Sequence, residues 1–92
     1  MGIDFEWDPE KENTNLLKHG VSFAEASTVF GDPLSLTIND QRHSSNEVRF
    51  VIMGQATTGR LLVVIHTERG SRIRIISARP ATRRERMNHE RR

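Results

Sequence analysis

The amino-acid sequence predicts a single α+β domain in which a largely antiparallel sheet carries two helices on one face. Three observations predict it: two capped helical segments near the start, four period-two strand segments after them, and a length of 92 residues, which suits one modest core. We expect residues 1–92 to form one domain with the order β-α-α-β-β-β-β-α, in which the last helix is basic.

A short strand and the first helix open the chain. Residues 3–7 alternate apolar and polar side chains, which is typical of a strand with one buried face. Asp8 then suits an N-cap, and Pro9 suits the first helical position because its missing N–H group would have no partner there. We expect this helix to end at His19, since Gly20 readily adopts the left-handed conformation that terminates helices.

A second helix and a second strand follow. Ser22 and Glu25 have the spacing of a capping box, in which Glu25 also reaches back to the start of the helix, and Gly31 is expected to end this helix. Residues 34–38 alternate again, which predicts a half-buried strand. The polar residues 39–46 predict an exposed loop.

The second half predicts the rest of the sheet and a last helix. Three strand segments are separated by short polar connections: 47–54, 60–68 and 72–78. Pro80 is expected to end the last strand, because proline has no N–H group to donate to a neighbouring strand. Residues 82–92 are polar and rich in arginine, which indicates a basic surface helix.

Charge is distributed unevenly along the chain. Residues 1–48 contain nine acids and three bases, whereas residues 49–92 contain eleven arginines and three acids. Arginine stays charged and forms bidentate hydrogen bonds to phosphate, so the second half is expected to bind a polyanion such as nucleic acid. The alternative is that the two oppositely charged halves pair with each other in the fold.

The composition argues against several classes of protein. Without cysteine, the chain has neither disulfides nor thiolate chemistry. No run of about eighteen apolar residues predicts a membrane span, and the acidic first segment lacks the layout of a signal peptide, so we expect a cytoplasmic protein. No carboxylate cluster or histidine pair has the spacing of a metal site, so we expect neither a metal nor a cofactor.

The pairing of the last two strands decides which side chains share a face. If Glu68 faces Arg72 across a three-residue connection, paired residues have the same parity. His66 and Glu68 then lie beside Arg72 and Arg74, above an aliphatic underside. We favour this register because a two-residue connection, which would place His66 among isoleucines, separates polar from apolar residues less well.

The predicted face has the side-chain types that RNA cleavage without a metal requires. A base takes the ribose 2′-OH proton, cations stabilise the phosphorane, and an acid protonates the leaving 5′-oxygen. His66 and Glu68 are the candidate acid and base, while Arg72 and Arg74 are candidate cations. Two alternatives remain open: a structural, half-buried His66, and a solvated ion pair between Glu68 and Arg72.

Three segments resemble the BrnT family of type II toxins: FEWDPEKENTNLLKHGVSF (Phe5–Phe23), FGDP (Phe30–Pro33) and RIRIISARPATRRER (Arg72–Arg86). The resemblance implies a RelE-like fold and a ribonuclease that arrests translation. It also implies a BrnA-type antitoxin with a ribbon-helix-helix domain, a heterotetramer dimerised through the antitoxin, and repression of its own operon by that complex at operator DNA.

The resemblance extends the candidate site to Arg79 and to the helix end at Lys18 and His19. We therefore expect a metal-independent endoribonuclease with these candidate catalytic residues: His66, Glu68, Arg72, Arg74, Arg79 and Lys18. The candidate RNA-binding residues are His19, Arg60, Arg69 and Arg83. The alternative function is a non-catalytic module that binds nucleic acid or antitoxin and acts only in transcriptional regulation.

Overall fold

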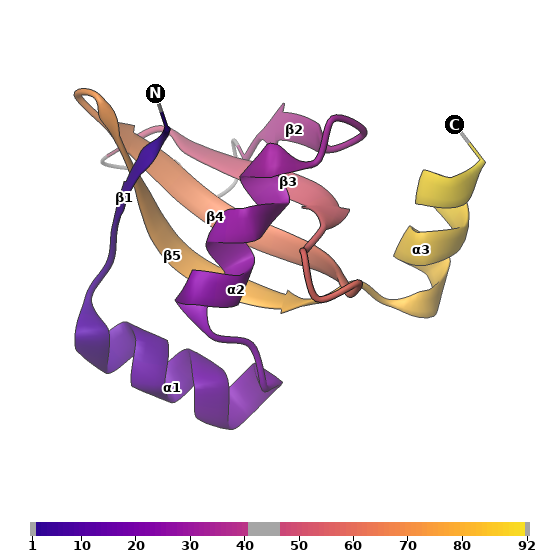
Figure 1. Ribbon diagram of the computed structural model, residues 1–92, viewed down its shortest axis with the longest axis horizontal. Helices are drawn as coiled ribbons and strands as arrows, with labels where there is room; N and C mark the ends of the chain where they lie inside the picture. Colours follow the sequence, from indigo (N-terminus) through magenta and orange to yellow (C-terminus); the bar gives the residue numbers. More distant parts are fainter. Residues whose placement is uncertain (1, 41–46, 92) are drawn as a thin grey trace.

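The computed structural model describes residues 2–40 and 47–91. Along these residues the elements follow one another as β1 (Asp4–Glu6), α1 (Pro9–His19), α2 (Phe23–Ser27), the 3₁₀ helix η1 (Thr28–Gly31), β2 (Leu36–Asn39), β3 (Arg49–Gln55), β4 (Leu61–Arg69), β5 (Arg72–Pro80) and α3 (Arg83–Glu90) (Figure 1). The strands form one sheet in the order β1-β5-β4-β3-β2. Strands β1 and β5 run parallel, and the other neighbouring pairs run antiparallel. The predicted α+β class with a largely antiparallel sheet is confirmed.

The first helix begins and ends, and the second helix begins, where the capping residues predict. Asp8 accepts a hydrogen bond from an amide of the first turn of α1 at 2.9 Å, and Gly20 follows the helix with a φ of 68°. Ser22 caps α2 by accepting from the amide of Glu25 at 3.0 Å. The Glu25 carboxylate, which was expected to reach back to the helix start, instead accepts hydrogen bonds from Arg60.

Some element bounds differ from those predicted. Helix α2 ends at Ser27, and the tighter η1 continues the chain to Gly31. Strand β5 extends to Pro80, where a strand end makes a missing N–H group tolerable. Residues 41–46 of the predicted loop lie outside the described residues, and Asn39 belongs to β2. Within the described residues, no helix is long and apolar enough to cross a lipid bilayer.

The hydrophobic core lies between the first helices and one face of the sheet, which we call the covered face. Phe23, Ala26 and Val29 contribute fully buried side chains from α2 and η1. The strand residues in the same cluster are Ile52, Leu62, Val64, Ile75 and Ala78. Burial of each large apolar side chain stabilises the fold by about 1.5–3 kcal/mol. In Figure 1, α2 lies across the sheet, whereas α3 stands apart from it beyond the end of β5.

Asn15 joins α1 to the edge of β5. Strand β1 pairs with β5 only as far as Arg74 among the described residues, so the edge of β5 beyond this point lacks a neighbouring strand. There the Asn15 side-chain amide donates to the carbonyl of Ala78 at 2.8 Å and accepts from its N–H group at 3.0 Å. A further donation to the carbonyl of Val21 at 2.9 Å fixes the segment after α1. Asn15 is 6 % exposed, so it replaces a strand at a buried sheet edge.

The connection between β4 and β5 is shorter than predicted. Arg69 pairs with Arg72, so the turn consists of the two residues Gly70 and Ser71. Gly70 has a φ of 59°, a positive value of the kind that two-residue hairpin turns require. The predicted three-residue connection between Glu68 and Arg72 is therefore wrong.

This turn reverses the expected faces near the hairpin tip. His66 pairs with Ile75 in the core, and Arg74 points to the opposite face. The register shifts between Ile65 and His66, where β5 contributes one additional residue, Ile76. A strict period of two cannot describe both sides of such an irregularity, because the additional residue changes the parity of the pairing.

Candidate active site on the open face of the sheet

The face of the sheet opposite the helices, which we call the open face, carries arginines of β5. Directly paired residues of neighbouring strands share a face. Arg74 pairs with Thr67 and Arg79 pairs with Val63, and both partners alternate with the core residues of β4. Because Arg79 comes five positions after Arg74, the two lie roughly 15 Å apart along the strand.

Glu6 lies between two arginines where β1 meets β5. Its Oε2 accepts a hydrogen bond from Arg74 Nη1 at 2.8 Å, and its Oε1 lies 3.8 Å from Arg72 Nη1. The parallel pairing of Glu6 with Arg74 produces this arrangement. The side chains of Glu6 and Arg74 are 25 % and 26 % exposed, so the pair is partly desolvated yet still accessible. The carboxylate thus lies beside two guanidinium groups of the kind that bind phosphate.

Arg79 is held by Glu85 at the start of α3. Its two terminal nitrogens donate to the two carboxylate oxygens at 2.7 and 2.9 Å, which is a bidentate pair. These bonds lower the pKa of Glu85 to about 2, with a further contribution from the backbone amide of Thr82. Glu85 is therefore an ionised, weakly basic group at neutral pH that orients the Arg79 guanidinium and completes the capping box of α3.

His66 lies on the covered face, away from the open-face arginines. It is 4 % exposed, stacks on Phe50 with ring centroids 5.7 Å apart, and meets Phe30 edge-on at 4.8 Å. Its Nδ1 has no hydrogen-bond partner among the described residues. Burial lowers the pKa of His66, because the charged imidazolium is disfavoured among apolar neighbours. This environment is typical of a neutral core histidine.

Lys18 and His19 lie at the end of α1, on another part of the surface. Both are exposed, and they line a cavity of about 410 Å³ together with Ile76 and Ser77 of β5. The open-face arginines do not line this cavity in the described part of the chain. The structure therefore does not bring the α1 end together with Arg74.

Arg60 is engaged in a structural contact. Its Nε donates to Glu25 at 2.9 Å and its Nη2 donates to the carbonyl of Gly20 at 2.9 Å, so it joins the start of β4 to the ends of the first helices. The Glu25 carboxylate also accepts from the Thr58 hydroxyl. The hydrogen bonds from Arg60 lower the pKa of Glu25. Arg60 remains 43 % exposed despite these contacts.

The remaining candidates are exposed at the two ends of β5. Glu68 and Arg69 lie at the β4–β5 hairpin tip, and Arg83 lies in the first turn of α3. Glu68 pairs with Ile73, on the side of His66. The register therefore places His66 and Glu68 on one face of the hairpin and Arg72 and Arg74 on the other. The prediction that all four form a single patch is wrong.

Two glutamates of the site were missed by the sequence reasoning. Glu85 carried a readable signal, because Thr82 precedes it by three residues as in a capping box. Glu6 lies in the alternating first strand, and its role depends on the parallel pairing of β1 with β5, which no local pattern indicates. Both side chains matter because they orient the arginines that the sequence identified.

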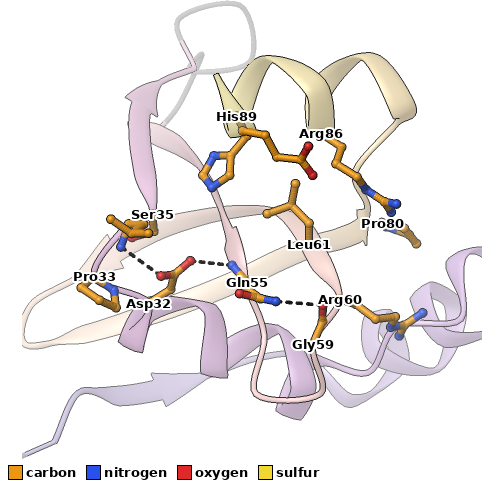
Figure 2. A pocket seen from close by; sticks show the side chains of 12 residues that line it. Asp32, Pro33, Ser35, Gln55, Gly59, Arg60, Leu61, Pro80, Arg86 and His89 are labelled. Atoms are coloured by element: carbon orange, nitrogen blue, oxygen red, sulfur yellow. Dashed lines mark hydrogen bonds between the residues drawn. The ribbon is translucent and has the colours of Figure 1, made fainter. Parts of the chain in front are cut away.

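A cavity of about 830 Å³ was also missed, at the end of the open face below α3 (Figure 2). Its walls come from residues 32–35, from Gln55 and Leu61 at the facing ends of β3 and β4, from Pro80 of β5, and from Arg86 and His89 of α3. Leu61 pairs with Gln55 and belongs to the next row of the open face after Val63. The cavity joins segments that are far apart in the sequence, so only the i, i+3 spacing of Arg86 and His89 was visible in the sequence.

Comparison with known proteins identifies the family. The model of the family described as "Ribonuclease toxin, BrnT, of type II toxin-antitoxin system" matches residues 7–85. The chain belongs to the BrnT family. The crystal structure of the Brucella abortus ribonuclease toxin BrnT is similar in fold, with a TM-score of 0.69 and 24 % identity over 89 % of this chain and 100 % of that chain. No curated protein matches the sequence.

Membership of the BrnT family sets the general function. Its members are ribonuclease toxins of type II toxin–antitoxin systems, which implies an antitoxin partner. Within residues 2–40 and 47–91, no group of three or more histidine, cysteine or acidic side chains is placed to hold a metal ion. The charged groups that gather on the open face are instead arginines with glutamate partners.

Proposed function

We propose that this BrnT-family chain is an endoribonuclease that cleaves RNA on the open face of its sheet and thereby arrests translation. The observation that carries the proposal is the Glu6 carboxylate between Arg72 and Arg74. The family match supports RNA as the substrate. The bidentate geometry of guanidinium groups suits a phosphodiester.

In the proposed reaction, the ribose 2′-oxygen bonds to the adjacent phosphorus and the 5′-oxygen leaves. Glu6 accepts the proton of the 2′-OH group, and water supplies a proton to the departing 5′-oxygen. Arg72 and Arg74 donate hydrogen bonds to the phosphorane oxygens, and these bonds strengthen as negative charge develops. Two guanidinium groups supply the positive charge that this step needs, so we propose that cleavage requires no metal.

Arg79 is proposed to bind a neighbouring phosphate of the same strand. At roughly 15 Å from Arg74 along β5, it lies too far away to contact the phosphate that is cleaved. Its contact fixes the path of the RNA across the open face and adds positive charge along that path. Arg69 and Arg83, exposed at opposite ends of β5, extend the same path.

Other residues that the sequence indicated have a different place in this proposal. His66 is assigned to the core, because it is 4 % exposed on the covered face. Arg60 is assigned to a structural contact, in which its Nε donates to Glu25 and its Nη2 donates to the carbonyl of Gly20. Lys18 and His19 lie beside another cavity and have no part in the cleavage step.

We propose further that a BrnA-type ribbon-helix-helix antitoxin neutralises the toxin by covering the open face. The exposed apolar side chains of Leu36 and Ile38 border this face on β2, the edge strand beside β3, and provide area for such contact. The complex is proposed to be a heterotetramer dimerised through the antitoxin, which binds operator DNA and represses its own operon.

RNA cleavage in the presence of EDTA tests the proposed function. The purified chain is expected to cleave single-stranded RNA, and Glu6→Gln is expected to slow cleavage by about 10²–10⁴-fold, the usual contribution of a general base. Glu10→Gln, a matched change at an exposed position in α1, serves as the control and is expected to retain full activity. Intact RNA after incubation with the folded wild type, with or without Mg²⁺ and ribosomes, would refute the proposal.

A further inference from the structure

The cavity below α3 has the size of a site for one nucleotide. Its volume of about 830 Å³ lies within the roughly 300–1,000 Å³ of typical small-ligand sites. It lies directly beyond Arg79 on the open face, because Leu61 and Gln55 of its wall form the row next to Val63. Pro80, the residue after Arg79, also lines it. A strand of RNA that contacts Arg79 therefore leads to this cavity.

The walls combine an apolar surface with polar groups that suit a base. Leu61 forms one wall, and His89 projects from α3 above it (Figure 2). The His89 Nδ1 is buried and has no hydrogen-bond partner among the described residues. Gln55 contributes a side-chain amide whose orientation is fixed by donation to the Gly59 carbonyl at 3.2 Å. A planar base between Leu61 and His89 would gain apolar contact with Leu61 and stacking contact with the imidazole.

The charges of the lining favour a phosphate beside Arg86. Asp32 and Glu90 are acidic and would repel a phosphate placed next to them. The Arg60 guanidinium, also in the lining, is already bound to Glu25. Arg86 is exposed at the α3 side and is placed to meet the single phosphate of a nucleotide whose base enters the cavity.

We propose that this cavity binds one nucleotide of the RNA substrate, on the Arg79 side of the cleaved bond, and that it contributes base preference. The proposal rests on the proposed ribonuclease function for the identity of the ligand. Its predicted contacts are the base against Leu61 and His89, and the phosphate on Arg86.

Binding of ribonucleoside 5′-monophosphates, followed by NMR chemical shifts, tests the site directly. The wild type is expected to bind at least one of the four saturably, with shifts at Leu61 and in α3. Arg86→Ala and His89→Ala are each expected to weaken binding by about tenfold, the loss of one charge-assisted hydrogen bond or one stacking contact. Arg84→Ala removes the same charge from an exposed position of α3 outside the lining and is expected to leave binding unchanged.

Mapping of cleavage positions completes the test. His89→Ala is expected to change the base preferred near the cut, whereas Arg84→Ala retains the wild-type pattern. Absence of saturable binding, or equal weakening by Arg84→Ala, would overturn the proposal and leave the cavity to a protein partner. Nucleotide binding without any RNA cleavage would support the cavity site and contradict the ribonuclease proposal, so the two failures are distinguishable.

Discussion

The covered and open faces belong to the same strands but place ionisable side chains in different environments. On the covered face, His66 packs against Phe30 and Phe50, and burial lowers its pKa. On the open face, Arg74 and Arg79 each have a glutamate partner and partial contact with solvent. The position of an ionisable side chain relative to the helices therefore decides whether it can contact a substrate. An imidazole on the covered face, such as that of His66, is a core residue.

This contrast predicts that changes on the two sides affect different properties. A substitution on the covered side should lower stability while each folded molecule keeps its activity. A substitution among the open-face arginines should lower activity with little loss of stability, because partly exposed ion pairs contribute only about 0–1 kcal/mol.

The largest expected loss of stability follows from Asn15→Ala. The change removes three hydrogen bonds to the backbone of Val21 and Ala78 at a buried sheet edge. Each buried polar group left unpaired costs about 1–3 kcal/mol, so the free energy of unfolding is expected to fall by about 3 kcal/mol. Urea denaturation followed by circular dichroism measures this difference.

The control for this change is Asn88→Ala at an exposed position of α3. Exposed substitutions usually change stability by no more than about 0.5 kcal/mol. Equal stability of the two variants would show that Asn15 does not hold the edge of β5. It would also contradict the expectation that substitutions on the covered side lower stability.

A smaller effect is expected in the pH dependence of stability, through His66. Because its pKa is lowered in the folded state from 6.5, the unfolded chain binds a proton more readily as the pH falls below this value. Stability should therefore decrease from about pH 6.5 downward, with a slope of at most about 1.4 kcal/mol per pH unit from this one group. His66→Phe is expected to flatten this part of the curve in denaturation experiments.

His19→Gln is the matched control, since His19 is exposed at the end of α1. It should keep the wild-type slope. If the slope persists in His66→Phe and disappears in His19→Gln, the titrating group is on the surface and the description of the covered face is wrong.

Local patterns in the sequence were sufficient to predict where the first two helices begin and which fold class the chain adopts. Asp8 and Ser22 cap their helices as predicted, and the alternation in the strands identified the sheet. The pairing register of β4 with β5 was harder to predict from the sequence. The two-residue turn at Gly70 and the additional residue Ile76 both change which residues share a face. Such shifts are decided by how the whole core packs, which no single hairpin pattern contains.

The candidate site shows the same division. Arg72 and Arg74 were identified as candidate cations of the last predicted strand, and Arg79 was added by the family resemblance. The structure places all three along β5. Their partners Glu6 and Glu85 come from β1 and α3, so recognising them required the tertiary fold. The sequence indicated the cations, and the acid–base assignment depended on which face each strand turns towards the helices.

The most direct test of the two faces compares RNA cleavage by Arg74→Ala and His66→Phe at neutral pH in EDTA, with rates corrected for the folded fraction. We expect a loss of about 10²–10³-fold for Arg74→Ala, as for removal of a donor to a developing oxyanion, and wild-type cleavage for His66→Phe. Full activity of Arg74→Ala together with an inactive but folded His66→Phe would contradict this expectation.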